Sequence, residues 1–382
     1  MTFTRAACLS PPGTSAIAVV GVRGPRAWPT VRELFRPRTG RPLPDLPPPR
    51  WFGLGAFGPE PGDEVVVAVK ETGSSASVEI HCHGGFEVVR WMLGLLAERG
   101  IETCSWQEWL GAEAPQPLRV AAAVALARAP TVRTAAILLD QYHGAFEKAL
   151  EAIRADLQGP AADVTAAADK LDRLVRHAAV GRHLTEPWRV VLAGAPNVGK
   201  SSLMNALMGY ARSIVAPIPG TTRDVVTALT AFDGWPVELA DTAGLRPGAE
   251  GLEAAGMERA RGTMGEADLV LWVVDAAAAP VWPEELAGPV LLVVNKIDLP
   301  PAWDLERAGN AVRVSAETGA GLADLSRALA AALVPTAPEA GAAVPFTPGL
   351  AARCEEAAAA LRGGRVEEAA ALVASLSQSP VE

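Results

Sequence analysis

The sequence predicts a multidomain protein of the α/β and α+β classes. A mostly parallel α/β domain is inserted in a helical domain, and an α+β domain precedes both. First, 382 residues of which 49% are hydrophobic are enough for two or three domains with cores of their own. Second, strand-like and helical patterns alternate over 187–334, which is typical of a parallel sheet. Third, the flanking segments are rich in Ala, Leu and Arg at helical spacing.

The amino-terminal α+β domain is expected to occupy residues 1–112. Its apolar runs predict strands over 15–22, 63–70 and 77–80. A helix is predicted over 86–100, ending at Gly100. The segment 36–50 is rich in Arg and Pro. Because proline removes a backbone donor and fixes φ, we expect an extended surface loop there.

The helical domain is expected in two parts, 113–186 and 336–382, on either side of an inserted domain at 187–335. Its first part contains three helical patterns, over 118–129, 134–157 and 169–180. A linker rich in Pro and Ala follows the inserted domain over 335–348, and the last segment is helical again.

Composition restricts the partners and the compartment. The net charge of −9 and pI of about 5.3 argue against bulk nucleic-acid binding. Residues 1–50 nevertheless hold eight Arg against one Glu and one Asp. One interpretation of this excess of positive charge is a local RNA-binding patch. The other is that arginine replaces lysine throughout the chain, which has 29 Arg and only five Lys. No C-x-x-C pair, signal peptide or apolar run of membrane-spanning length is present, so we expect a cytoplasmic protein without membrane contact.

The stretch GAPNVGKS, Gly194 to Ser201, follows a predicted strand and precedes a predicted helix. This is the P-loop pattern, in which backbone N–H groups surround phosphate oxygens at the positive end of a helix. Lysine in this pattern reaches the terminal phosphates, and the serine hydroxyl binds Mg²⁺. The residues expected to contact the nucleotide here are Asn197, Val198, Gly199, Lys200, Ser201 and Ser202.

Further motifs follow in the order found in GTPases. DTAG begins with Asp241, which can hold Mg²⁺ through water, and ends with Gly244, whose N–H can meet the γ-phosphate. Thr222 lies between these motifs, where a switch loop would bring its hydroxyl to Mg²⁺. The magnesium ligands are therefore expected to be Ser201 and Thr222.

Two motifs indicate guanine rather than adenine. NKID supplies Asn295, Lys296 and Asp298 after an apolar strand. The Asp298 carboxylate can accept from guanine N1–H and the exocyclic amine, a pair that adenine lacks. SAETG supplies Ser315 and Ala316, where a backbone contact to the guanine carbonyl is expected. The substrate is thus predicted to be GTP with Mg²⁺.

The group that places the attacking water is not the usual one. In Ras-like enzymes a glutamine follows the DTAG-type motif, whereas Leu245 follows Gly244 here. Asn197 in the P-loop and the long segment 213–224 suggest that a monovalent cation such as K⁺ bridges the phosphates.

These motifs resemble those of the MnmE (TrmE) family of tRNA-modification GTPases. The resemblance lies in the P-loop with SSL after it, IVAPIPGTTRD, DTAGLR followed by LEAAGMERA, and NKID, and also in PPGTSAIAVV and EIHCHGG. It implies a homodimer formed through the amino-terminal domain, and GTPase domains that meet across K⁺. The implied K⁺ ligands are Asn197, Ala216, Ile218 and Thr221, and the implied water-orienting glutamate is Glu253. A solvated helix charge is the other reading of Glu253.

The resemblance also implies partners. Family members act with a flavin-dependent protein on the wobble uridine of certain tRNAs and draw one carbon from a formyl-folate. In that comparison Glu79 matches a folate-contacting glutamate.

The stretch EIHCHGG, Glu79 to Gly85, has three interpretations: a metal site, a folate contact through Glu79, or a structural corner. If the strand continues through it, His81 and His83 share one face and Cys82 points away, which disfavours a common metal.

The sequence departs from the family outside the GTPase motifs. Gly21 replaces a basic residue that serves the folate, and SWQEWLGAEAPQPLRV over 105–120 replaces a segment that contains a lysine. The family ends in C-I-G-K, whereas this sequence ends in SLSQSPVE and its last cysteine, Cys354, is expected to be a buried thiol. Two hypotheses therefore stand: an enzyme of tRNA wobble-uridine modification, or a GTP-dependent switch acting on RNA, ribosome assembly or another partner.

Overall fold

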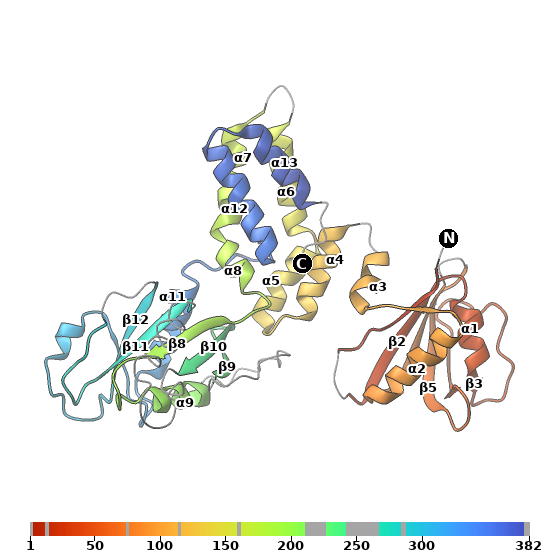
Figure 1. Cartoon of the computed structure of the whole chain (residues 1–382), viewed down its shortest axis with the longest axis horizontal. Coiled ribbons are helices and arrows are strands. Elements are labelled where there is room, and N and C mark those ends of the chain that lie inside the picture. The colour runs from red at the N-terminus through yellow and green to blue at the C-terminus, as the bar shows by residue number, and fades with distance from the viewer. Residues whose placement is uncertain are drawn as a thin grey trace, which may run out of the picture. The chain divides into compact units, whose positions relative to one another are not determined.

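The computed structural model describes residues 3–11, 15–73, 76–113, 116–158, 162–210, 227–241, 267–283 and 288–377. The chain forms two compact units, residues 1–115 and 116–382 (Figure 1). Within the described residues, no helix combines the length and apolar character needed to cross a membrane.

The first unit contains a seven-stranded sheet in the order β3-β4-β5-β6-β2-β1-β7. Its neighbours are antiparallel except for the parallel pair β1 and β7. The strands are β1 Arg5–Cys8, β2 Ile17–Arg23, β3 Phe35–Pro37, β4 Phe52–Phe57, β5 Asp63–Glu71, β6 Ser77–His83 and β7 Glu102–Thr103. The strands predicted over 15–22, 63–70 and 77–80 are confirmed as β2, β5 and β6. The loop predicted over 36–50 begins only after β3, which includes Arg36 and Pro37; β3 is an edge strand, where proline is tolerated.

Three helices accompany this sheet: α1 Ala27–Leu34, α2 Phe86–Glu98 and α3 Trp106–Glu113. Helices α1 and α2 contribute Val31 and Leu96 to a core that includes Val20 and Ile80 of the sheet. The predicted end of α2 is confirmed, because Gly100 has a φ of +71°, a conformation that side chains with a Cβ rarely adopt.

The second unit includes helices from both ends of its sequence. They are α4 Pro117–Ala127, α5 Val132–Tyr142, α6 Ala145–Leu157, α7 Val164–Arg176, α8 Ala178–Arg182, α12 Pro348–Arg362 and α13 Val366–Leu376. Helix α12 packs on α7 and α8, and α13 packs on α6 (Figure 1). Phe146 and Phe346 meet edge to face at 5.8 Å between ring centroids. Segments far apart in sequence thus share one core.

Two helix boundaries differ from the predictions. The helical pattern over 169–180 is divided between α7 and α8 at His177. The helical pattern over 134–157 is divided between α5 and α6 by Gly144, whose φ is +90°. Apolar periodicity continues through this position because both helices bury residues in the same core, so the period alone did not show the break.

The second unit also contains a six-stranded sheet in the order β13-β12-β11-β8-β10-β9. All neighbours are parallel except β9 and β10. The elements are β8 Trp188–Ala193, α9 Lys200–Tyr210, β9 Thr227–Phe232, β10 Trp235–Asp241, β11 Leu269–Asp275, β12 Val290–Asn295, a 3-10 helix Leu305–Ala308, β13 Val312–Arg313 and α11 Leu322–Leu333. In such sheets, ligands bind at the carboxyl ends of the parallel strands.

A polar cluster lies at the start of β8. Asp268 accepts a hydrogen bond from the Arg189 N–H at 2.7 Å, and its other oxygen is 3.5 Å from Nε2 of His183. The His183 ring stacks on Trp188 at 3.7 Å. Burial acts to raise the pKa of Asp268, but the hydrogen bonds from His183 and Arg189 outweigh it and hold the pKa below its ordinary value.

This cluster gives stability a defined pH dependence. A carboxyl group whose pKa is lower in the folded state stabilises the fold above its unfolded pKa of about 3.9, and this contribution disappears as pH falls through the folded pKa. We expect Asp268→Asn to lower the free energy of unfolding by about 1 kcal/mol at pH 7 and by less at pH 3. Urea unfolding at both pH values measures this difference. Glu151→Gln, which alters an exposed carboxylate on α6, is the control, and an equal loss at both pH values would contradict the assignment.

Candidate nucleotide-binding site

The P-loop joins β8 to α9 at the carboxyl edge of the second sheet, and three of its residues have positive φ. Gly194 has a φ of +137°, and a Cβ there would lie 2.3 Å from the Val273 carbonyl oxygen. Gly199 has a φ of +91°, and a Cβ there would lie 2.5 Å from Nδ2 of Asn295. Asn197 has a φ of +64°. The loop therefore depends on glycine where it approaches β11 and β12.

Lys200 and Ser201 begin α9. The Lys200 ammonium donates to the carbonyl oxygens of Gly194 at 3.0 Å and Ala195 at 2.9 Å, so it lies within the loop. The Ser201 hydroxyl donates to Asp241, which ends β10. Hydroxyl and carboxylate oxygens are the ligands that Mg²⁺ prefers, and the amino end of α9 favours negative charge. The arrangement suits a magnesium-bound polyphosphate.

Asn295 connects three loops. Its amide nitrogen donates to the Val198 carbonyl at 3.0 Å, and its amide oxygen accepts from the Ala316 N–H at 3.1 Å. The side chain is 1% exposed. Asn295 thus holds the P-loop and the SAETG segment at fixed positions relative to NKID.

Lys296 reinforces this connection through a residue that the sequence reasoning missed. Its ammonium donates to the Asn197 carbonyl at 2.8 Å and to Asp275 at 2.6 Å. Asp275 ends β11 and is paired with Asn295 in the parallel ladder. The available signal was an apolar strand that ends in aspartate, as β10 does. Asp275 positions Lys296 and therefore the P-loop.

The remaining predicted contacts lie at the same edge of the sheet. Asp298 and Ser202 are exposed, whereas Ser315 is buried and its hydroxyl accepts from the Thr318 N–H at 3.0 Å. Ala316 is half-buried, and its N–H is already engaged with Asn295.

Comparisons with known proteins agree with this site. A family model described as "50S ribosome-binding GTPase" matches residues 189–296, and one described as "GTP-binding protein TrmE N-terminus" matches residues 4–108. The chain is 36% identical to the tRNA modification GTPase MnmE of Symbiobacterium thermophilum, over 83% of this chain and 80% of that protein. It is 34% identical to the MnmE of Nitratidesulfovibrio vulgaris, over 90% of this chain and 84% of that protein.

The chain belongs to the MnmE family of tRNA modification GTPases. As a member of that family it is a GTP-hydrolysing enzyme that uses GTP with Mg²⁺. The switch hypothesis is not favoured by this membership. Among solved structures, the G domain of the FeoB iron transporter of T. maritima is 31% identical over 39% of this chain and 98% of that chain, with a TM-score of 0.29.

Several residues that the GTPase motifs or the MnmE resemblance implicate lie outside the described residues. They are the cation ligands, the switch threonine, the γ-phosphate glycine and the water-orienting glutamate: Ala216, Ile218, Thr221, Thr222, Gly244 and Glu253. Their roles stay predictions.

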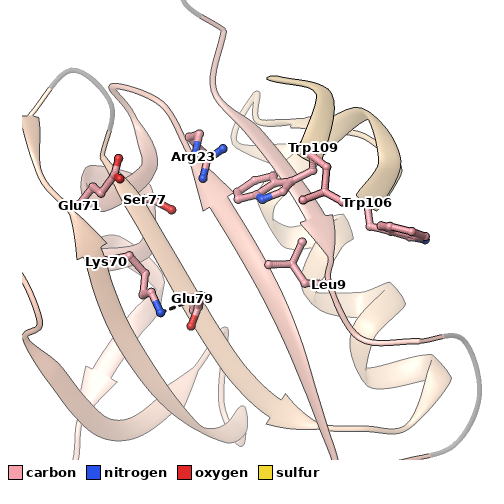
Figure 2. A pocket seen from close by; sticks show the side chains of 9 residues that line it. Leu9, Arg23, Lys70, Glu71, Ser77, Glu79, Trp106 and Trp109 are labelled. Carbon is pink, nitrogen blue, oxygen red and sulfur yellow. Dashed lines mark ion pairs between the residues drawn. The ribbon is translucent and has the colours of Figure 1, made fainter. Parts of the chain in front are cut away.

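The TrmE-type amino-terminal domain contains a pocket of about 360 Å³ (Figure 2). It is lined by Leu9, Arg23, Lys70, Glu71, Ser77, Glu79, Trp106, Trp109 and Leu110. Glu79 lies opposite Gly21 in the sheet and pairs with Lys70 at 3.5 Å. A Cβ at Gly21 would lie 2.8 Å from the Trp109 ring, so that ring fills the space where a side chain at position 21 would lie. The guanidinium of Arg23, two residues further along β2, lies 4.7 Å from the centre of the Trp109 ring.

The EIHCHGG stretch belongs mostly to β6, and its side chains alternate as predicted. Cys82 is buried, while His81 and His83 share the other face with Glu79. His81 is 3.3 Å from Glu79, and His83 is 2.6 Å from Asp63, so the two imidazoles have different carboxylate partners. No cluster of metal-ligating side chains occurs among the described residues. Burial raises the pKa of Cys82 to about 11, which makes it an inert thiol.

Cys354 is also a buried thiol, as predicted. It lies in α12, is 0% exposed, and burial raises its pKa to about 12. It is therefore an unreactive thiol.

Proposed function

We propose that this chain is a K⁺-activated GTPase that acts, as a homodimer with a flavin-dependent partner, in the modification of tRNA wobble uridine. One observation supports this proposal most directly: Lys200, the Ser201–Asp241 pair and Asn295 all lie at one edge of the second sheet. That arrangement brings together the groups for phosphate, magnesium and guanine within a chain of this family. Cytoplasmic location and the absence of membrane contact belong to the same proposal.

The nucleotide is held by groups that already have partners in the structure. Lys200 would exchange its two loop carbonyls for phosphate oxygens, and Ser201 and Asp241 would hold Mg²⁺, which would offset the charge of the phosphates. Asp298 reads the guanine edge. The Ala316 N–H shares its contact between Asn295 and the guanine carbonyl. Thr222 would provide a further ligand to Mg²⁺.

K⁺ supplies the charge stabilisation that a glutamine or an arginine supplies in other GTPases. Asn197 supports this role because its side chain is exposed while its carbonyl is held by Lys296. The backbone of Ala216, Ile218 and Thr221 would complete the ion's ligands, and Glu253 would orient water. Activation then requires two GTPase domains to meet, so hydrolysis depends on the homodimer.

The amino-terminal pocket fits a formyl-folate by the chemistry of its lining. Glu79 and Ser77 offer hydrogen-bonding oxygens, Trp109 offers a flat apolar surface, and Arg23 offers a positive charge where Gly21 has none. A folate bound there would supply a one-carbon unit. The residues that would hold it are Glu79, Arg23 and Trp109.

The deciding test is mass spectrometry of wobble nucleosides in bulk tRNA from the host with and without the gene. We expect a 5-substituted uridine to disappear on deletion and to return with the wild-type gene. A Lys200→Ala copy, which cannot hold the phosphates, is the matched control and should not restore it. The modification role would be wrong if the nucleoside profile stayed unchanged and the purified protein did not bind formyl-tetrahydrofolate. The switch hypothesis would then be the better explanation.

A further inference from the structure

A second pocket lies inside the unit formed by residues 116–382. Its volume is about 710 Å³, and it lies between α6, α7 and α8 on one side and the segment 333–343 on the other. Much of its wall is apolar: Ala149, Ala152, Leu174, Ala179, Val180, Leu333, Val334, Pro335, Ala337, Ala342 and Ala343. Its size lies within the range of small-ligand sites, about 300–1,000 Å³.

One helix provides the charge of this pocket. Lys170, Arg173 and Arg176 of α7 all line it, and their spacing of three places them on one side of the helix. Lys170 is paired with Asp156 at 2.5 Å. Arg173 and Arg176 are exposed and form no ion pair with any residue that the structure describes. Only Glu339 brings a negative charge to the lining, so the pocket is cationic in a chain of net charge −9.

His177 adds a polar group with unused capacity. It lines the pocket, and its Nδ1 is buried without a hydrogen-bond partner in the described part of the chain. Burial, and then the charge of Arg176, lowers the pKa of His177, so the imidazole is neutral at neutral pH. A neutral imidazole offers one donor and one acceptor.

We propose that this pocket receives a phosphorylated nucleotide of tRNA, with the phosphate between Arg173 and Arg176 and the nucleoside against the apolar wall. Arginine is suited to the phosphate because its planar fork can donate two parallel hydrogen bonds. The alanine-rich wall leaves room for a base and sugar, and His177 provides a polar contact. This inference rests on the proposed function, because it takes tRNA as the source of the phosphate ester.

The test measures binding of the full-length protein to an unmodified tRNA transcript with a wobble uridine, by filter binding at several salt concentrations. We expect the double variant Arg173→Ala, Arg176→Ala to bind at least about 10-fold more weakly than wild type. The slope of log K against log salt should fall by about 0.7 to 0.9, since the variant loses one phosphate contact. GTP turnover without tRNA should stay unchanged.

The control distinguishes a loss of tRNA binding in the pocket from the effect of removing positive charge at the end of a helix. Arg173 and Arg176 lie in the last turn of α7, where positive charge stabilises a helix by up to about 1 kcal/mol. The matched double variant Arg327→Ala, Arg362→Ala removes two arginines from α11 and α12, one of them from a last helical turn. It should bind tRNA as wild type does. Equal affinity of the two double variants would overturn the proposal.

A third variant tests the cavity itself. Ala152→Trp places a large ring in the pocket while Lys170, Arg173 and Arg176 remain, so we expect weaker tRNA binding by a similar factor. Affinity as in wild type would mean that surface charge alone binds RNA, and the pocket proposal would be wrong. Competition with uridine monophosphate and with inorganic phosphate shows whether the pocket takes its phosphate group from tRNA or from a small molecule. If the protein bound either small molecule tightly but did not bind tRNA, the pocket proposal would also be wrong.

The two proposals fail separately. If pocket variants bind tRNA normally while deletion of the gene still removes the modified nucleoside, only the pocket is wrong. If the pocket variants lose tRNA binding while the nucleoside profile never depended on the gene, the modification role is wrong and the tRNA site remains.

Discussion

Replacing Asp298 by asparagine is expected to lower GTP affinity by at least about 100-fold and to create affinity for xanthosine triphosphate. The carboxylate accepts two hydrogen bonds from guanine, each worth about 1.5–3 kcal/mol when one partner is charged. Asparagine cannot accept both, because half of its amide donates. Xanthine has a carbonyl where guanine has an amine, so the amide of asparagine matches it. Asp298 is exposed, which allows the exchange without disturbing the core.

Fluorescent nucleotide analogues measure both affinities directly. Asp304→Asn is the control, because it removes one carboxylate from the segment that follows NKID, where Asp304 only caps the 3-10 helix at 3.0 Å from the Glu306 N–H. The control should keep GTP preference. If Asp298→Asn weakened GTP and xanthosine triphosphate equally, the aspartate would have no role in recognising the base.

GTP turnover is expected to be at least about 10-fold faster in KCl than in NaCl at equal ionic strength. The reason is that Leu245 replaces the glutamine that orients water in other GTPases, so that a cation of suitable size must stabilise the charge on the phosphates. Asn197→Gly should remove this advantage of KCl while nucleotide affinity changes little. Glycine is the right replacement, because Asn197 has a φ of +64° and alanine would be strained there.

Phosphate release assays in the two salts provide the measurement. Asn205→Ala, which removes an exposed asparagine from α9, should keep the difference between the salts. Glu253→Ala should reduce turnover in both salts and leave affinity nearly intact. Equal rates of the wild-type protein in KCl and NaCl would exclude the cation mechanism.

The nucleotide site was largely predictable because each of its motifs is a local arrangement. One strand–loop–helix segment contains the glycines at 194 and 199 together with Lys200 and Ser201. Their spacing along the sequence was therefore enough to identify them. Asp241 and Asn295 end parallel strands, and such ends meet at one edge of a sheet. The strand through EIHCHGG was predictable for the same reason, since its alternation has a period of two.

Other features required contacts between distant segments. Asp275 became visible as the partner of Lys296 only when β11 and β12 were seen side by side. The Trp109 ring fills the space above Gly21 although 88 positions separate the two residues, and no local pattern encodes that packing.

The amino-acid sequence by itself determined the family, the GTPase chemistry and the order of the GTPase motifs, because short motifs encode them. Only the tertiary structure decided which side chains lie together around the two pockets and that Gly144 separates α5 from α6. The physical reason is that packing and cavity shape depend on long-range contacts, and these arise from the whole core rather than from any one segment.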